Sequence, residues 1–384
     1  MNIRYGIDEF LSRFEKNYVT YNRIEVSKSA LTYNLNYFIG RLNKPVIPVL
    51  KANAYGHGIG LVARALSGSG CPYLAVDGYF EALRIRRVCK TPVLIMGAIA
   101  PENYANMHLD NYAFVVDEAE TIDALGHTGR PVKLHLEINS GMNRRGVKQD
   151  QAGELTRRIL SYKNLELEGV MSHLADSDGD NPNTVNRAVS IFDSCVEEIK
   201  AAGANPSIIH LAQTAGSLKA KSKYANAVRI GIGLYGLNPF SSTHKLHKDL
   251  QSLKPALKLI STVSKVIDLN TGDRVSYNYT FTADKPLRIG ILPLGYYEGV
   301  NRSLSNKGQV KIGDKFMPIV GKICMNHTII ALGDSNTKVG DEAVVISDNP
   351  RDLNSLDSIS STFNLFNYNL LTALSQDVRR LLVE

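Results

Sequence analysis

Short runs of apolar, β-branched residues alternate with amphipathic stretches between about residue 45 and residue 234. This alternation is typical of parallel βα units, whose strands are buried between helices. Eight runs can be counted: Val46 to Ala52, Tyr73 to Asp77, Val93 to Ala98, Tyr112 to Val116, Lys133 to Ile138, Leu167 to Leu174, Ile208 to Thr214 and Ala227 to Leu234. Because eight parallel strands close a barrel, the pattern predicts an α/β fold, a (β/α)8 TIM barrel.

The pattern changes after about Pro255, where long segments of alternating apolar and polar residues replace the helical periodicity. These segments are Leu257 to Leu269, Arg274 to Ala283, Leu287 to Leu294 and Gln309 to Leu332, the last folded at Gly313-Asp314. They predict a mostly-β C-terminal domain, closed by a helical pattern from Tyr368 to Leu382. The expected organisation is an N-terminal extension over residues 1–21, the barrel over residues 22–255 and the second domain over residues 256–384.

The composition of the 384-residue chain is that of a globular protein, with 44% hydrophobic and 21% charged residues. Its formal net charge of +7 is spread along the sequence without interleaved aromatic residues, so a nucleic-acid surface is not expected. A small anionic ligand suits this balance better.

The cysteines and the apolar runs bear on the cellular compartment. The four cysteines, Cys71, Cys89, Cys195 and Cys324, form no C-x-x-C pair, which indicates neither a zinc site nor a disulfide scaffold. Met1 to Tyr18 lacks the apolar core of a signal peptide, and no run reaches the ~18 apolar residues of a membrane span. We therefore expect no metal, no membrane association and a cytoplasmic location.

Polar residues recur where the predicted barrel strands end, which is the rim where barrel enzymes carry their chemistry. Lys51 ends the first strand and His173 ends the sixth, while Arg144 follows the fifth. Thr214 ends the seventh strand and Arg229 lies in the eighth. Each has a structural explanation when taken singly, but their convergence on one rim predicts a site. A lysine amine in this place can form a Schiff base with an aldehyde cofactor.

Small residues follow the seventh and eighth strands, where barrels commonly bind phosphate. The segments are Thr214-Ala215-Gly216-Ser217 and Gly231-Ile232-Gly233, and Tyr55 offers a phenol donor nearby in sequence. Small side chains let the backbone N–H groups approach an anion, so these segments predict a phosphate site.

The same segments resemble those of the alanine racemase family. The matching motifs are Lys51 to Gly58, Gly141-Met142-Asn143-Arg144, Ser172-His173, His210 to Ala215, Val228 to Ile232 with Tyr235-Gly236, and Val275-Ser276-Tyr277. The resemblance implies a fold type III pyridoxal 5'-phosphate enzyme. In it Lys51 binds the cofactor, Tyr55, Thr214, Gly231 and Ile232 hold its phosphate, Arg144 contacts its phenolic oxygen, and His173 lies beneath it.

Arg229 favours racemisation within this resemblance. An arginine that faces the pyridine nitrogen does not readily give up a proton, so the ring is a weaker electron sink and reprotonation at Cα is favoured. Inversion requires bases on both faces of Cα, and the resemblance implies Lys51 and Tyr277 as this pair.

The resemblance also implies that Tyr277 enters the site from a partner subunit, in a homodimer with shared active sites. Tyr296, Met325 and Arg144 then correspond to substrate-binding residues, and Tyr368 lies at the entrance. Bulky side chains at a pocket mouth favour a small substrate, hence the interconversion of L-alanine and D-alanine, with D-alanine supplied to peptidoglycan.

The chain departs from the family's pattern at several positions. Glu137 stands where these enzymes usually carry a carbamylated lysine, and we expect its carboxylate to be the negative partner of Arg144. Asn326 replaces an aspartate beside Met325, and Asn143 replaces a glycine. Such changes allow a shifted substrate range.

Other functions stay open at this point. A racemase of another amino acid, such as serine, is the nearest alternative. A fold type III decarboxylase shares the architecture, but the chain lacks that group's glycine-rich phosphate loop and cysteine-centred motif. A non-catalytic pyridoxal-phosphate-binding protein would have no need of a second domain that carries Tyr277.

Overall fold

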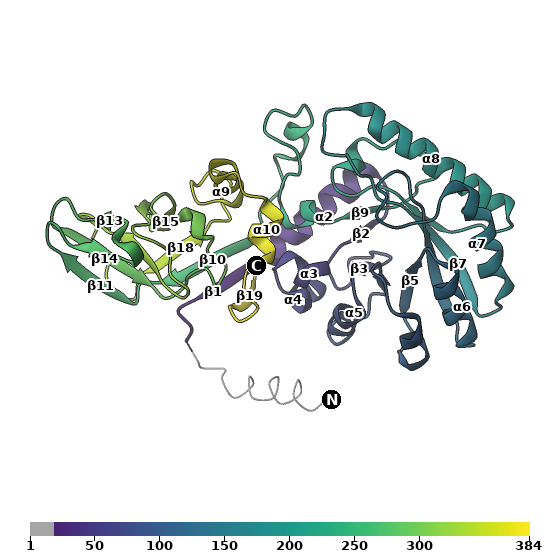
Figure 1. The fold of residues 1–384 in the computed structure, drawn as a ribbon, viewed down its shortest axis with the longest axis horizontal. Coiled ribbons are helices and arrows are strands. Elements are labelled where there is room, and N and C mark those ends of the chain that lie inside the picture. Colours follow the sequence, from purple (N-terminus) through teal and green to yellow (C-terminus); the bar gives the residue numbers. More distant parts are fainter. Residues whose placement is uncertain (1–18) are drawn as a thin grey trace.

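The structure, a computed structural model, describes residues 19–384. Residues 1–18, which contain most of the extension expected over residues 1–21, lie outside the described part. The chain forms two lobes, a barrel with surrounding helices and a β-rich lobe, joined where α10 (Asn367–Thr372) lies near α2 (Lys28–Leu42) and α3 (Lys51–Tyr55) (Figure 1). Within residues 19–384, no helix combines the length and apolar character needed to cross a membrane.

The barrel predicted from the alternation is confirmed. Its strands are β2 (Val46–Pro48), β3 (Leu74–Val76), β4 (Val93–Ile95), β5 (Tyr112–Val116), β6 (Val132–Glu137), β7 (Leu165–Met171), β8 (Ile208–His210) and β9 (Val228–Ile230). β3 to β8 form one six-stranded sheet and β2 pairs with β9, all in parallel. Single bridges, Val49 to Ala75 and His210 to Ala227, link the two sheets and close the ring.

Helices cover the outside of the barrel. They are α2 (Lys28–Leu42), α4 (Ile59–Ala65), α5 (Tyr79–Arg86), α6 (Ala119–His127), α7 (Gln149–Ser161) and α8 (Pro182–Ala201), whereas the short α3 (Lys51–Tyr55) lies at the rim of the barrel, after β2. α8 shows how the sequence forms such an element: the Asn181 side chain caps it by accepting from the Asn183 amide, and Pro182 fits the first turn. Its buried stripe includes Val185, Val189 and Phe192, which pack on the barrel.

The second lobe is built from β-sheet. Its strands are β10 (Leu257–Thr262), β11 (Lys265–Leu269), β12 (Arg274–Val275), β13 (Phe281–Thr282), β14 (Leu287–Leu292), β15 (Gln309–Ile312), β16 (Lys315–Pro318), β17 (Thr328–Ala331) and β18 (Glu342–Ile346), followed by α9 (Leu356–Phe363). β15 and β16 form an antiparallel hairpin around Gly313-Asp314, and Gly313 takes the positive φ of 56° that this tight turn requires. The sheet orders are β16-β15-β18-β10-β1-β19 and β11-β14-β17, with β12 and β13 paired separately. Two strands from the ends of the described chain, β1 (Arg23–Ser27) and β19 (Arg379–Val383), complete the larger sheet.

The two ends of the described chain join this lobe in a way that the local pattern does not indicate. β1 (Arg23–Ser27) pairs with β10 and with β19 (Arg379–Val383). Residues 23–27, which come before the barrel strands in the sequence, therefore belong to the larger sheet of the second lobe. The helical pattern expected from Tyr368 to Leu382 is wrong beyond Thr372, because Arg379–Val383 add a parallel strand beside β1. Pairing with a distant strand has overridden a local helical periodicity.

Candidate active site

A cavity of about 560 Å³ opens at the carboxyl ends of the barrel strands. Nine of the residues predicted for the site line it together: Lys51, Tyr55, Arg144, His173, Thr214, Arg229, Gly231, Ile232 and Tyr368. They come from segments spread over the whole barrel and from α10, and the closed ring of strands brings them to one rim. The cavity is therefore the candidate active site.

Lys51 opens a left-handed turn of the backbone. Ala52, Asn53, Ala54 and Tyr55 all have φ between 51° and 54°, a conformation that costs each residue about 1–2 kcal/mol. Hydrogen bonds from Gly56 N to Ala52 O (3.0 Å) and from Gly58 N to Asn53 O (2.9 Å) hold the turn. The Lys51 ammonium forms no hydrogen bond or ion pair with the residues of the described part, so its amine is uncommitted.

The C-terminal segment packs against this turn. Gly56 has a φ of +81°, and a Cβ at this position would lie 2.1 Å from the carbonyl oxygen of Leu371. The Arg380 side chain donates to Gly56 O at 2.7 Å and also to the carbonyl of Val378. The lysine turn is thus fixed from outside the barrel by residues more than three hundred positions later.

His57, which follows Gly56, stabilises the lysine turn through its buried side chain. Its ring is buried, and Nδ1 lies 3.1 Å from Ala54 O and 3.0 Å from Tyr55 O. Burial lowers the pKa of His57 to about 4, so the ring is neutral at pH 7 and donates from Nδ1.

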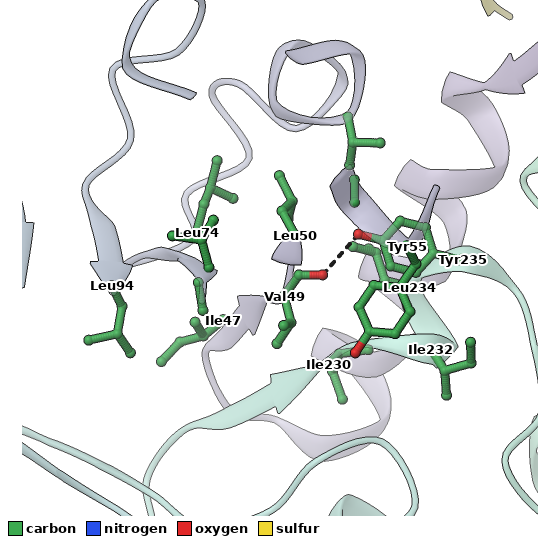
Figure 2. Close-up of a cluster of buried hydrophobic side chains, with 14 of the residues drawn as sticks. Ile47, Val49, Leu50, Tyr55, Leu74, Leu94, Ile230, Ile232, Leu234 and Tyr235 are labelled. Carbon is green, nitrogen blue, oxygen red and sulfur yellow. Dashed lines mark hydrogen bonds between the residues drawn. The ribbon is translucent and has the colours of Figure 1, made fainter. Parts of the chain in front are cut away.

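Tyr55 presents its phenol to the cavity. Its ring lies against those of Tyr235 and Tyr368, with centroids 5.0 and 5.9 Å away. The Tyr235 hydroxyl donates to Val49 O at 2.8 Å, which ties this aromatic group to the end of the first barrel strand (Figure 2). Burial raises the pKa of Tyr55, so its hydroxyl stays protonated and can donate. A Cβ on Gly231 would lie 2.6 Å from this hydroxyl, which explains the glycine there.

The loops after β8 and β9 have the properties of an anion site. The amide groups of Thr214 and Ala215 donate no hydrogen bond within residues 19–384. The Thr214 hydroxyl accepts from Gly233 N at 3.3 Å and so joins the two loops. The buried Gln213 Oε1, on the same wall, lacks a partner among the described residues. Free donors beside the Tyr55 phenol suit a phosphate group.

Arg229 carries a charge into the barrel interior, where its side chain is only 2% exposed. Its guanidinium donates to His210 Nδ1 at 2.7 Å, to His210 O at 2.9 Å and to Ser172 O at 2.5 Å. Burial lowers the pKa of Arg229 to about 10, which leaves it protonated at neutral pH. Burial, reinforced by the charge of Arg229, lowers the pKa of His173 to about 3, so this imidazole is neutral.

The arginine loop after β6 differs from the expected arrangement. Glu137 is 5% exposed, and burial raises its pKa against the opposing charge of Arg145. Its ion pair joins Oε2 to Nε of Arg145 at 3.8 Å, whereas Arg144 forms no ion pair within the described part. Arg145 in turn binds Asp117, with Nη2 2.5 Å from Oδ1. The expected Glu137–Arg144 pair is therefore replaced by a Glu137–Arg145–Asp117 group.

The sequence-based reasoning missed Arg145 and Asp117. A signal was present, because Asp117 directly follows β5, at the rim where site residues gather. Asp77, which follows β3 and also lines the cavity, carries the same signal.

Tyr277, Tyr296 and Met325 do not line this cavity. They lie in the second lobe, where their side chains are 64%, 43% and 54% exposed. The backbone nevertheless gathers their segments: Tyr296 N donates to Cys324 O at 3.1 Å, and Ser276 Oγ donates to Lys322 O at 2.5 Å. One chain thus holds two separate groups, a cavity at the barrel rim and an exposed cluster made of these three residues.

Comparisons with known proteins agree with this architecture. Residues 26–239 match the family "Alanine racemase, N-terminal domain", and residues 256–382 match "Alanine racemase, C-terminal domain". The alanine racemase of Francisella tularensis is 33% identical over 373 residues, covering 94% of this chain and 100% of that protein.

Solved structures show the same fold. The alanine racemase of Bacillus anthracis with bound L-Ala-P is 28% identical, with a TM-score of 0.86 over 96% of each chain. The alanine racemase of Bartonella henselae, solved with covalently bound pyridoxal phosphate, is 22% identical, with a TM-score of 0.80 over 95% of this chain and 100% of that one.

Proposed function

The chain belongs to the alanine racemase family, and on this premise we propose that it is a pyridoxal 5'-phosphate-dependent isomerase that interconverts L-alanine and D-alanine. The observation that carries the proposal is the uncommitted amine of Lys51 in the same cavity as the buried guanidinium of Arg229. In a cytoplasmic enzyme of this kind, the D-alanine would supply peptidoglycan synthesis.

The cavity residues fit the cofactor by their chemistry. Lys51 would hold its aldehyde carbon, the Tyr55 phenol and the amides beside Thr214 would hold its phosphate, and Arg229 would face its ring nitrogen. Arg144 would approach the phenolic oxygen, His173 would lie beneath the ring, and Tyr368 would close the site at the entrance, with Gly231 and Ile232 leaving room for the phosphate. When bound, pyridoxal phosphate withdraws electrons from Cα of an amino acid and so acidifies its proton.

Two bases of this chain then act on the Cα proton from opposite faces. The Lys51 amine exchanges a proton on one face, and the Tyr277 phenol exchanges it on the other. Arg229 stays protonated and donates no proton to the ring, because its pKa of about 10 lies well above neutral pH. The site therefore favours return of the proton to Cα.

Tyr277 reaches a cavity only across a subunit interface in this proposal. Its exposed side chain lines no part of its own chain's cavity, while the preceding residue, Ser276, donates to Lys322 O in the segment that leads to Met325. A two-fold homodimer brings such a cluster to the partner's barrel twice, by the same contact. Tyr296 and Met325, together with Arg144, would then bind the substrate and narrow the pocket to a small side chain.

Mixing two inactive variants tests the shared site. Lys51→Ala and Tyr277→Phe each leave no intact site in a homodimer. A mixed dimer contains one intact site if Tyr277 acts in the partner's cavity, so random pairing restores about a quarter of the wild-type activity. No recovery, with mixed dimers verified by affinity tags, would contradict the shared site. A Tyr277→Phe homodimer that racemises alanine as fast as wild type would contradict the role of the tyrosine.

Glu137 has a proposed role in the same site. Its buried carboxylate lies between the arginine loop and the cavity, and we infer that it balances the adjacent guanidinium groups of Arg144 and Arg145. The Glu137 carboxylate then supplies the negative charge that the family's usual carbamylated lysine would carry at this position.

A further inference from the structure

A chain of buried polar side chains crosses the barrel interior behind Arg229. Arg229 Nη1 lies 2.7 Å from His210 Nδ1, and His210 Nε2 lies 2.8 Å from His135 Nδ1. His135 Nε2 lies 3.3 Å from Glu168 Oε2. Both histidines are fully buried and Glu168 is 8% exposed, so no solvent competes for these contacts along the chain.

Arg229 at one end of this hydrogen-bonded series and Glu168 at the other determine which ring nitrogen of each histidine carries the hydrogen. A guanidinium has only donors, so His210 Nδ1 must accept and its hydrogen must lie on Nε2. That hydrogen points at His135 Nδ1, which must also accept, so His135 carries its hydrogen on Nε2. An ionised carboxylate has only acceptors, and Glu168 receives that hydrogen. The assignment made from the arginine end therefore agrees with the one made from the glutamate end.

The charges support this order. Burial lowers the pKa of both His135 and His210, so each is neutral and has a single ring hydrogen. Burial opposes ionisation of Glu168, but hydrogen bonds from His135, Lys133 and Tyr73 lower its pKa to about 2. Lys133 Nζ lies 2.5 Å from Oε1, on the side of the carboxylate away from His135.

The fold makes room for this group. β7 pairs Leu167 with Leu134 and then Gly169 with His135, so Glu168 is an extra residue in the ladder. Such a bulge re-aims a side chain. A Cβ on Gly169 would lie 2.4 Å from His135 Nδ1, which shows that the glycine leaves space for the ring.

We propose that Glu168, His135 and His210 are positioning residues for Arg229. The carboxylate sets the tautomers of both histidines and thereby keeps His210 Nδ1 available to the guanidinium. The inference rests on the proposed function in one respect, that Arg229 faces the cofactor ring. If the tautomers reverse, an N–H of His210 opposes an N–H of Arg229 and the guanidinium must move.

Glu168→Gln reverses the order for a specific reason. The half-exposed Lys133 donates to Oε1, and the new amide keeps this bond only by turning its oxygen toward Lys133 and its NH2 toward His135. His135 Nε2 must then accept, and both histidines carry their hydrogen on Nδ1. In the double variant Lys133→Met/Glu168→Gln the amide is free to turn its oxygen back to His135, which restores the original order. Glu166→Gln is the matched control, because Glu166 is an exposed carboxylate on the same strand.

The experiment combines histidine 15N NMR with steady-state kinetics on the holoenzyme. Wild type should show pyrrole-type Nε2 and pyridine-type Nδ1 for both His135 and His210, assigned by signal loss in His135→Gln and His210→Gln. Glu168→Gln should exchange these types and lower kcat for alanine by about 10- to 100-fold, with KM changed less than about threefold, because the lost bond is to a charged group that does not touch the substrate. The double variant should recover kcat to within about threefold of Lys133→Met, and Glu166→Gln should match wild type.

Several results would overturn the inference. An Nδ1 hydrogen on either histidine in wild type does so without any variant, even if Glu168→Gln fails to fold. Unchanged tautomers in Glu168→Gln would also overturn it. So would a Lys133→Met/Glu168→Gln variant whose kcat is no higher than that of Glu168→Gln. The expected tautomers in a protein without racemase activity would contradict the proposed function while supporting the positioning chain.

Discussion

Replacing Gly56 with alanine tests how the C-terminal segment holds the lysine turn. Two costs add at this position. The φ of +81° costs an alanine about 1–2 kcal/mol. The new Cβ also lies 2.1 Å from Leu371 O, whereas ordinary contacts begin at 3.4 Å, so the turn and α10 must separate by more than a side-chain adjustment allows. Overpacking of this kind costs about 1–3 kcal/mol.

Gly68→Ala separates these two costs. Gly68 has nearly the same φ, +79°, but nothing lies within 4 Å of its added Cβ. It should lose only the conformational part, so Gly56→Ala should be the less stable of the two by about 2 kcal/mol. Because the turn positions Lys51, Gly56→Ala should also retain less pyridoxal phosphate, while Gly68→Ala should retain as much as wild type.

Urea unfolding of the cofactor-free proteins, followed by circular dichroism, measures the first effect. Absorbance of the bound cofactor after gel filtration measures the second. Equal unfolding midpoints for the two variants would show that the close approach to Leu371 costs nothing beyond the positive φ, which is the opposite of the expected result.

Two further predictions concern charge. Glu137→Gln should reduce cofactor affinity or kcat by about tenfold, because Arg145 loses a buried ion-pair partner. The control Glu118→Gln, at an exposed position, should change neither quantity. Unchanged affinity and kcat in Glu137→Gln would contradict the role of Glu137. The pKa of His57 falls from 6.5 to about 4 on folding, so the unfolded chain takes up this proton first as the pH decreases. Stability should therefore fall between pH 6.5 and 4, by about 3 kcal/mol from this group, and His57→Gln should show a shallower loss in urea unfolding measured across that range. An identical pH dependence would contradict the assignment.

The sequence predicts the parts of the fold that depend on local periodicity. Eight strand runs indicate the barrel, and Gly313-Asp314 indicates the β15–β16 hairpin of the second lobe, because strand length and turn chemistry are local properties. The strand at residues 379–383 could not be predicted, since only its pairing with β1 makes it extended. The left-handed turn after Lys51 is equally hidden, because alanine gives no sign of positive φ.

The candidate site shows the same division. Lys51, Arg144 and Arg229 could be placed by the rule that barrel sites lie at strand ends. The choice of Arg145 as the ion-pair partner of Glu137 depends on side-chain direction, which spacing along the sequence does not give. His135 and Glu168 alternate with apolar residues and look like ordinary strand positions until the bulge in β7 turns them toward each other.

Incubation of the purified holoenzyme with L-alanine in deuterated water distinguishes racemisation of alanine from the alternative reactions. We expect D-alanine to accumulate to a near-equal mixture and solvent deuterium to appear at Cα of the product, because the proton that leaves one face is replaced on the other by a residue in exchange with solvent. Deuterium-free alanine with no D-enantiomer would contradict this expectation, as would release of carbon dioxide from an amino acid or preferential racemisation of serine.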